Sequence, residues 1–553
     1  MFSKLQNLKI DKPLLYILII TAFLMLVRIS QVDFTGDNSH YAVRSLGYVD
    51  TMFSDQQTTP LNWFEHFPWW ANLSFHDHPA LLFFVQHIFL SIHESIFFAK
   101  LPYVLFSLGT LILVYQGAKE NYGEDIAFWS TLFLAFNSLF LYTVRAGYME
   151  AGVIFFIALT LFFFSRFLKQ EKYWWYFGVS LGLCFLAKYS VFFLLPALFG
   201  YILIKHRGIL KRKKIYLALL LFLAVASPII IYNLMMYKTT GHFDYQFSRL
   251  FHTANPWVAD EVGGAVMNLW GLFILLGKAV LFPYLILSLI GLICALSKKK
   301  MLLIAGCILF LTGMFVITGA SYNHLNLYNL FLVLPLAYFF VTLKNWQKLP
   351  KMISKTFVYI FTAYIFITAV NSHILIRPFM ETGAGWFVSG AVNKNVGIYQ
   401  LDRYLDKLIA DNNILSIRDG YQELKNKKPS LVDKYGTKPE ALQLPARQFS
   451  DMIVYDDNLN WFVELWPFKR RRFYHNIPIL STEELKRFAP EAIFEKIYFI
   501  KATENTAIEG PIAWTDFPIE FEKTLIDKGI EPVDYIYRTD GLLAFKVYIF
   551  EFE

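Results

Sequence analysis

The sequence contains few charged residues and few cysteines for its length. Of its 553 residues only 17% are charged, whereas 56% are hydrophobic and 18% are aromatic, and the mean hydropathy is +0.42. This composition excludes an ordinary soluble globular protein and predicts an integral membrane protein. The three cysteines all lie in apolar segments, so the polar regions contain no pair that can form a disulfide; these are Cys184, Cys294 and Cys307.

Two further absences narrow the class of protein. No glycine-rich phosphate loop stands beside a strand-like segment, which argues against a nucleotide-binding domain. The apolar run 13–27 follows Lys9 and Lys12 as in a signal sequence, but no small-residue cleavage pattern comes after it, so we expect a retained membrane anchor. The net charge of +8 comes from short cationic clusters between apolar segments. Such clusters set membrane orientation, and no nucleic-acid partner is expected.

Apolar segments recur along most of the chain, and about eleven of them are predicted to cross a bilayer, for which about 20 residues each are needed. The fifth and sixth share one apolar stretch that is broken only by Lys188. The predicted fold class is therefore a polytopic α-helical membrane protein with about eleven transmembrane helices. The segments are 13–30, 98–117, 125–143, 148–168, 174–188, 190–205, 215–236, 270–296, 301–319, 324–343 and 354–376.

The shorter apolar segment 80–92 decides the orientation of these helices. It contains His87 and is too short for a comfortable span. If it lies in the membrane interface without crossing, every cationic cluster between the spans faces one side, as the positive-inside rule requires. We therefore expect a multi-pass protein of the cell (cytoplasmic) membrane with a cytoplasmic N-terminus. Its first outer loop, 31–97, would contain this interfacial helix.

The long apolar segments stop near residue 376. This predicts a membrane domain over 1–376 and a soluble domain over 377–553, on the extracytoplasmic side. The second domain is expected to be α/β, because 396–409 has helical periodicity and Ser481 with Glu484 forms a capping box. Strand-like runs rich in aromatic and β-branched residues lie at 451–456, 493–501 and 542–552.

Acidic and basic residues gather in the segments that this topology places outside. Asp37, in "FTGDNSHYA" (34–42), follows the first span closely, and Glu150 is a second carboxylate on that side. Transfer of a glycosyl group needs a base near the acceptor and positive charge near the leaving phosphate. The basic residues available there are Arg145, Lys188, Arg249 and Lys278, with His78 and His252 nearby in the sequence.

Several motifs in this region occur in a recognisable order. They are "GDNSHYA" (36–42), "FHDHPALLFF" (75–84), "AKLP" (99–102), "YTVRAGYMEAGVIFF" (142–156) and "GLCFLAKYSVFFLLP" (182–196). Each is weak alone, but together, over residues 10 to 260, the chain resembles the bacterial relatives of the dolichyl-phosphate-mannose protein mannosyltransferases. These are membrane glycosyltransferases of class C, and some of them modify lipid A. The resemblance implies the class C fold, a polyprenyl-phosphate sugar donor and inversion at the anomeric carbon.

The resemblance also implies roles for single residues. Asp37 corresponds to the family's catalytic base and Tyr41 to the tyrosine beside it, here proposed to position the substrate, whereas Asn38 replaces the usual second acid. Glu150 corresponds to a second functional acid. His78, Arg145 and Lys188 correspond to residues that hold the donor phosphate, and Arg249 is assigned to the same task. The physical setting agrees, because nucleotide sugars are confined to the cytoplasm and an outer site must be supplied by a lipid carrier.

The sequence leaves several alternatives open. A divalent metal bound by His76 and His78 with Asp37 or Glu150 is one, since imidazole and carboxylate suit zinc or manganese, although the spacing is no recognised ligand pattern. The run "KRRR" (469–472) is either a solvated face or a site for an anionic acceptor or lipid headgroups. A transporter or lipid flippase, or a non-catalytic scaffold, would use many of the same spans. The sugar is not readable, nor is the acceptor, whether lipid, glycan or protein.

Overall fold

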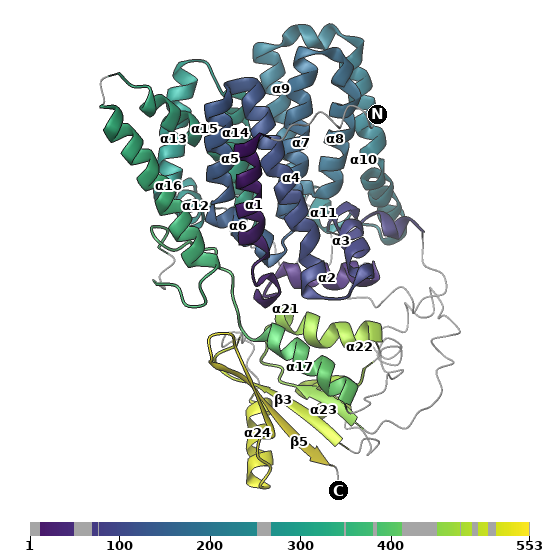
Figure 1. Ribbon diagram of the computed structural model, residues 1–553. Coiled ribbons are helices and arrows are strands. Elements are labelled where there is room, and N and C mark those ends of the chain that lie inside the picture. The colour runs from purple at the N-terminus through teal and green to yellow at the C-terminus, as the bar shows by residue number, and fades with distance from the viewer. Residues whose placement is uncertain are drawn as a thin grey trace. The chain divides into compact units, whose positions relative to one another are not determined.

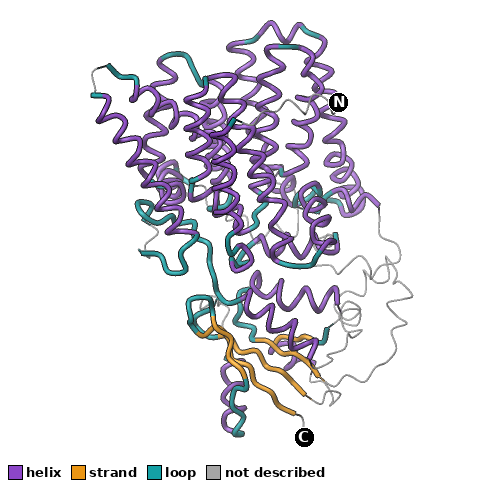
Figure 2. Tube along the Cα trace, in the orientation of Figure 1, coloured by secondary structure: helices purple, strands orange, loops and turns teal. Residues whose placement is uncertain are grey.

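The structure is a computed structural model that describes residues 11–48, 69–75, 77–251, 267–347, 350–379, 384–411, 451–475, 477–488, 496–506 and 516–551. Helices make up most of these residues, and the strands all come from the C-terminal part of the chain (Figure 2). Two compact units are present. The first contains residues 1–29, 77–82 and 100–393, and the second contains 30–76, 83–99 and 394–553. The domain boundary predicted after residue 376 rests on membrane placement and stays a prediction.

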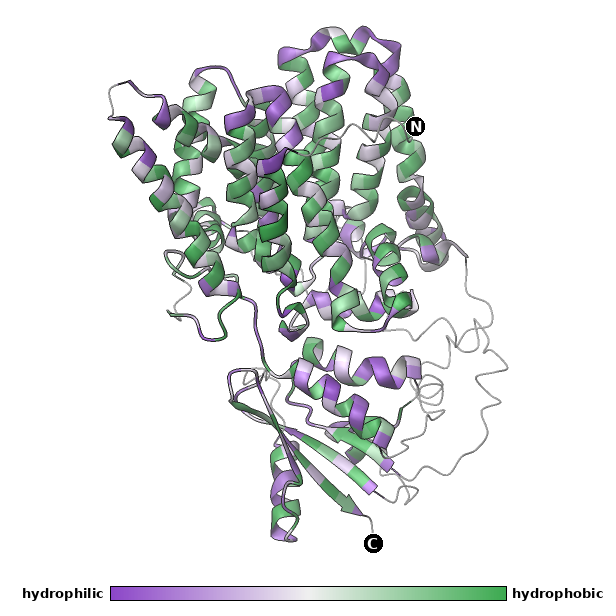
Figure 3. Ribbon diagram, in the orientation of Figure 1, coloured by the Kyte–Doolittle hydropathy of each residue, from purple (hydrophilic) through white to green (hydrophobic). Residues whose placement is uncertain are grey.

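The first unit is a bundle of helices, and each of the apolar segments predicted to cross the membrane forms helix (Figure 1). The helices are α1 (Lys12–Leu26), α4 (Ile96–Tyr122), α5 (Glu124–Ala135), α6 (Ser138–Ala146), α7 (Glu150–Lys169), α8 (Trp174–Ala187), α9 (Leu194–Lys205), α10 (Lys213–Thr240), α11 (Tyr245–Phe251), α12 (Leu269–Val280), α13 (Phe282–Ser297), α14 (Leu302–Thr318), α15 (Leu327–Lys344) and α16 (Lys351–His373). Figure 3 shows hydrophobic residues along their lengths and hydrophilic residues where α7 connects to α8 and α9 to α10.

Within the described ranges, five helices are long and apolar enough to cross a membrane, or up to seven if each bent pair is one span. The bent pairs are α5 with α6, at 53°, and α12 with α13, at 114°. Further apolar helices, among them α1 and α14, are shorter. The predicted polytopic helical fold is confirmed, whereas the number of about eleven crossings stays a prediction.

The sharp bend between α12 and α13 differs from the single span predicted over 270–296. Leu281 has a φ of 81°, so the helix stops there, and Pro283 stands in the first turn of α13. Proline is favoured at a helix start because it has no amide hydrogen to donate. The sequence signal was therefore present at Pro283, inside a run whose hydropathy gave no sign of a break.

Small residues allow close contact between neighbouring helices of the first unit. A Cβ atom at Gly178 of α8 would come 2.6 Å from the carbonyl oxygen of Ala218 in α10. A Cβ at Gly291 of α13 would come 2.0 Å from the carbonyl oxygen of Pro335 in α15. Helices in membranes associate through such small residues, because lipid provides no hydrophobic force between them. These contacts hold α8 against α10 and α13 against α15.

The second unit contains a five-stranded mixed sheet in the order β2-β1-β3-β5-β4. The parallel strands are β1 (Asp451–Tyr455), β2 (Ile479–Ser481) and β3 (Lys496–Ala502), and β5 (Leu543–Glu551) is antiparallel to β3 and to β4 (Asp534–Tyr537). Successive side chains alternate between two apolar cores, so Ile453 and Tyr455 belong to one and Met452 and Val454 to the other. The predicted C-terminal α/β domain is thus confirmed.

Helices cover both cores of this sheet. The first core contains α17 (Ile398–Asp411) and the second contains Leu485 and Leu525 from α23 (Thr482–Phe488) and α24 (Phe517–Asp527). The predicted capping box at the start of α23 is present: the amide of Glu484 donates to Ser481 Oγ at 3.2 Å, and the amide of Ser481 donates to Glu484 Oε2 at 2.9 Å. Such reciprocal bonds satisfy amides that the helix itself leaves without partners.

The first loop of the chain packs into this same second unit. It includes α2 (Asp37–Gly47), the 3₁₀ turn η4 (Trp69–Leu73) and most of α3 (Leu81–Ile92). Asp33 accepts hydrogen bonds from the amides of Val396, Ile398 and Tyr399 at 2.5–3.1 Å, and so caps the start of α17. Phe34 packs edge to face on Trp466 with ring centroids 5.3 Å apart. Residues more than 350 positions apart in the sequence are therefore held as one body.

The basic run 469–472 is neither a solvated face nor an open anion site. Arg470, Arg471 and Arg472 are 4%, 2% and 3% exposed. They begin α22 (Arg470–His475), directly after α21 (Trp461–Glu464) and the π-helical turn η9 (Leu465–Lys469). Each arginine forms an ion pair, and the carboxylates are Asp402, Asp406, Glu94 and Glu484. Both readings that the sequence left open are therefore wrong, because folding brings in acidic partners from distant segments.

Candidate functional site

Glu150 and Lys188 form a buried ion pair at the ends of two packed helices of the first unit. Glu150 is the first residue of α7, and Lys188 follows the end of α8 in extended conformation, with φ −168° and ψ 145°. Lys188 Nζ lies 2.7 Å from Glu150 Oε1, and the two side chains are 7% and 1% exposed. Each charge also suits its helix end, because carboxylates are favoured at N-termini and cations at C-termini.

His324 extends this pair. Its Nε2 lies 3.5 Å from the same Oε1 of Glu150, and its side chain is 33% exposed. The other carboxylate oxygen of Glu150, Oε2, has no hydrogen-bond partner among the described residues. His324 was missed in the sequence, although it stands at a predicted outer helix start, as Glu150 does. The cluster therefore combines a buried charge pair with an imidazole that solvent or a ligand can reach.

His78 and Asp77 lie close to this cluster in the same unit. His78 Nδ1 is 2.9 Å from Asp77 Oδ2, and both side chains are largely buried. His78 is within electrostatic reach of His324, and Asp77 is within reach of Asp244. The structure thus brings together His78, Glu150 and Lys188 of the predicted site residues.

Asp244 is a second buried carboxylate that sequence reasoning did not single out. It lies between α10 and α11 and is fully buried. Its Oδ2 accepts from Tyr189 Oη at 2.6 Å and from Asn233 Nδ2 at 3.0 Å, and Oδ1 accepts from the amide of Phe247 at 3.0 Å. Burial raises the pKa of Asp244 to about 6, although these hydrogen bonds oppose the shift. Tyr189 adjoins Lys188, so this network supports the position of the ion pair.

Arg145 has a different environment from the one its predicted role requires. It is 2% exposed, and its Nη1 donates to the carbonyl oxygens of Leu24, Met25 and Val27 at 2.6, 3.3 and 2.9 Å. These carbonyls belong to the end of α1, where a helix leaves acceptors without partners. Arg145 therefore stabilises the C-terminus of α1, and Glu150 pairs with Lys188 instead of with it.

Asp37 and Tyr41 lie in the second unit. Asp37 is the half-buried first residue of α2, where the helix N-terminus favours a carboxylate. Asn38 is buried and its Oδ1 accepts from the amides of Gly36 and Ser39, both at 3.0 Å, so it helps to shape this helix start. Tyr41 is 4% exposed, and its ring packs edge to face on Phe83.

The remaining candidates are only partly covered. His76 and His252 lie outside the described residues, and so does the side chain of Arg249, whose backbone belongs to α11. Lys278 is half-buried in the last turn of α12. The part of the chain that the structure describes contains no group of three or more metal-ligating side chains. The metal alternative depends on His76, which lies outside these residues, and it stays a prediction.

The chain is similar to known proteins both in sequence, through a family model, and in structure. A model of the family described as dolichyl-phosphate-mannose-protein mannosyltransferase matches residues 77–232. ArnT from Cupriavidus metallidurans, solved bound to undecaprenyl phosphate, aligns with a TM-score of 0.51 at 11% identity over 97% of both chains. AglB, an oligosaccharyltransferase from Archaeoglobus fulgidus solved with an inhibitory peptide and a dolichol-phosphate, aligns with a TM-score of 0.43 at 13% identity, covering 88% of this chain and 69% of its own.

No protein of curated function matches the chain. The matched residues 77–232 include His78, Arg145, Glu150 and Lys188, so the resemblance predicted from the motifs is confirmed. The similarity to ArnT extends over nearly the whole chain and confirms the class C glycosyltransferase fold.

Proposed function

We propose that this protein transfers a sugar from a polyprenyl-phosphate donor to an acceptor on the outer face of the cytoplasmic membrane, because residues 77–232 match the model of the dolichyl-phosphate-mannose-protein mannosyltransferase family. The observation that carries the proposal is the buried pair of Glu150 and Lys188, which lies inside the matched segment and touches the partly exposed His324. The undecaprenyl phosphate bound to ArnT supports a donor of this chemical class.

In the proposed reaction an acceptor oxygen attacks the anomeric carbon of the donor sugar. The new glycosidic bond forms as the bond from that carbon to the phosphate oxygen breaks, with inversion. Asp37 takes the acceptor proton as general base, and polyprenyl phosphate leaves with the bonding electrons. Tyr41 is buried, so its proposed part is to hold the start of α2 and thereby Asp37.

The cations are proposed to offset the charge that develops on the leaving phosphate. Lys188 suits this task as the cation paired with Glu150, and the imidazoles of His324, beside that pair, and of His78 are proposed to donate hydrogen bonds to the phosphate. Arg249 is retained as a phosphate ligand on the resemblance alone. For Arg145 we propose positioning instead, since its Nη1 is occupied by the carbonyls of α1.

The test is release of free polyprenyl phosphate. The purified protein would be incubated with a panel of polyprenyl-phosphate sugars and membrane extract, next to the variants Asp37→Asn and Asp125→Asn. Asp125 is an exposed carboxylate in the first turn of α5 and serves as the matched control. We expect release by the wild type and the control and loss of it in Asp37→Asn.

Substantial turnover in folded Asp37→Asn would exclude that residue as the base. If folded wild-type protein released no polyprenyl phosphate from any donor, the result would instead favour a transporter or a scaffold. In both cases folding would be checked by the thermal melting of each protein in detergent.

A further inference from the structure

A second candidate site lies in the first unit, toward the end of α7 that is opposite Glu150. It is a cavity of about 460 Å³ between α4, α7, α9, α14 and α15, within the range of roughly 300–1,000 Å³ that is typical of ligand pockets. Lys169, the last residue of α7, lines it. Glu150 is the first residue of that helix, so the two sites are about 30 Å apart along α7.

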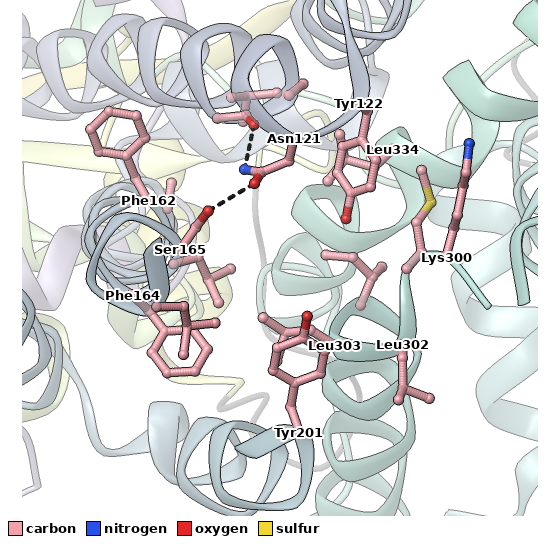
Figure 4. A pocket seen from close by; sticks show the side chains of 18 of the residues that line it. Asn121, Tyr122, Phe162, Phe164, Ser165, Tyr201, Lys300, Leu302, Leu303 and Leu334 are labelled. Carbon is pink, nitrogen blue, oxygen red and sulfur yellow. Dashed lines mark hydrogen bonds between the residues drawn. The ribbon is translucent and has the colours of Figure 1, made fainter. Parts of the chain in front are cut away.

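The walls of the cavity are apolar over most of their depth. On α7 the lining extends from Lys169 to Ala158, which is about 16 Å along the axis. This depth is close to half of the roughly 30 Å hydrocarbon core of a bilayer. Leucine and phenylalanine side chains from α4, α7, α14 and α15 line it; Figure 4 labels Phe162, Phe164, Leu303 and Leu334 among them.

Few uncharged polar side chains line the cavity, and Ser165 and Asn121 among them are hydrogen-bonded. Ser165 Oγ donates to Asn121 Oδ1 at 2.9 Å, and Asn121 Nδ2 donates to the carbonyl oxygen of Gly117 at 2.8 Å, which ties α7 to α4. Figure 4 shows the hydroxyl ends of Tyr122 and Tyr201 turned toward one another across the space. These groups leave room for an apolar chain with a polar end near the tyrosines.

Cations surround the mouth of the cavity. Lys169, Lys205, Lys299 and Lys300 all line it and are exposed, and His206 stands beside them. Lys169 Nζ donates to the carbonyl oxygen of Glu120, while the Glu120 carboxylate pairs with Arg166. Among the described residues that line the cavity, none is acidic. Lysines near a membrane surface attract anionic lipid headgroups.

We propose that this cavity binds an anionic diacyl phospholipid, with one acyl chain between the helices and the headgroup phosphate at the lysines. The charge of the mouth selects an anionic headgroup over a zwitterionic one. The depth of about one leaflet suits an acyl chain and is too short for a long polyprenyl carrier. The proposal does not depend on the proposed sugar transfer, because the cavity shares no residue with the cluster around Glu150.

The experiment measures lipid binding by native mass spectrometry of the full-length protein in detergent. The probes are dioleoyl phosphatidylglycerol, dioleoyl phosphatidylcholine and undecaprenyl phosphate. We expect phosphatidylglycerol to bind about tenfold more tightly than phosphatidylcholine, as expected for 1.4 kcal/mol at 25 °C. The variant Lys205→Gln/Lys300→Gln should lose this preference, whereas Lys211→Gln/Lys213→Gln, which removes two exposed lysines outside the cavity, should keep it.

A third variant tests the apolar part. Gly117 lines the cavity, and a Cβ there would meet only Phe162, at 3.7 Å, so Gly117→Leu fills the space without a backbone clash. It should weaken phosphatidylglycerol binding without moving the melting temperature of the lipid-free protein. Equal binding of the two phospholipids would overturn the proposal, as would equal losses in both lysine pairs. So would displacement of phosphatidylglycerol by equimolar undecaprenyl phosphate, which would assign the cavity to the carrier.

Discussion

Two groups of buried charge, one in each unit, differ in how their charges are used. In the second unit Arg470, Arg471 and Arg472 are each paired with a carboxylate, and the acidic partners come from four separate residues. In the first unit a single lysine and a single carboxylate face one another, and one oxygen of Glu150 has no hydrogen-bond partner among the described residues.

The difference teaches that buried charge alone does not mark a functional site. A network in which every arginine is paired with a carboxylate holds the fold, and removal of one partner is costly because it leaves an uncompensated charge. The pair of Glu150 and Lys188 instead adjoins His324, whose side chain is 33% exposed and can be reached by a substrate. Substitutions in the Glu150 and Lys188 pair are therefore expected to affect turnover, and substitutions in the arginine network are expected to affect stability.

The largest expected effect is on turnover, at Glu150. Glu150→Gln keeps the shape of the side chain but removes the charge that faces Lys188, so we expect polyprenyl-phosphate release to fall about 100-fold or more. Lys188→Met should cause a similar loss. The double variant should be no worse than either single variant, because the two residues act as one unit.

The matched control is Glu120→Gln, which removes a carboxylate paired with Arg166 near the opposite end of the same helices. Turnover of this variant should stay near that of the wild type. If Glu150→Gln retained full turnover, or if the loss were explained by a lower melting temperature, the pair would belong with the structural group instead.

The next effect is on stability, at Arg471. Its guanidinium pairs with both Asp402 and Asp406, so Arg471→Met leaves buried Asp402 with one cation fewer. We expect a loss of about 3–5 kcal/mol in the free energy of unfolding, read as a lower melting temperature of the full-length protein. Lys407→Gln, on the exposed face of the same α17, is the control. A melting temperature unchanged in Arg471→Met would show that the network is dispensable.

The sequence predicted the parts of the fold that local patterns determine. The apolar runs became helices, the aromatic and β-branched runs became β1, β3 and β5, and Lys188 did interrupt its apolar stretch. Both contacts that were missed join distant residues: His324 meets Glu150, and Asp244 meets Tyr189. No spacing within one segment encodes such contacts, since they depend on which helices pack together.

The interpretation of the run 469–472 failed for the same physical reason. A row of basic residues looks solvated until its partners are known, and here Glu94, Asp402 and Glu484 come from three other segments. Burial raises the pKa of Glu94, but the hydrogen bond with His475 and the charge of Arg470 outweigh burial and leave that pKa below its usual value. Tertiary packing therefore decides whether such a basic residue is available to bind a ligand or forms an ion pair that stabilises the fold.

A smaller effect, on pH dependence, is expected at Asp244. Its pKa of about 6 in the folded protein is above the value of about 3.9 for the unfolded chain. Its contribution to stability is thus fully present below about pH 4 and is lost as the pH rises through 6, by about 3 kcal/mol in all. The melting temperature of the wild type relative to Asp244→Asn should therefore fall between pH 4 and 7. Asp527→Asn, at an exposed site, should show no such trend, and parallel curves for Asp244→Asn would contradict the shift.

The smallest effect tests the attachment of the first loop inside the second unit. Tyr474 Oη donates to the carbonyl oxygen of Val43 in α2 at 2.8 Å, and α2 begins with Asp37. Tyr474→Phe keeps the ring and removes only the hydroxyl with its hydrogen bonding to α2, so we expect a loss of about 0.5–1.5 kcal/mol in the free energy of unfolding. Tyr537→Phe, at a side chain that is 51% exposed, should lose nothing measurable. If the two variants melted alike, the loop would be held by its other contacts, such as the packing of Phe34 on Trp466 and the hydrogen bonds of Asp33, and the Tyr474 hydrogen bond would contribute nothing to the position of Asp37.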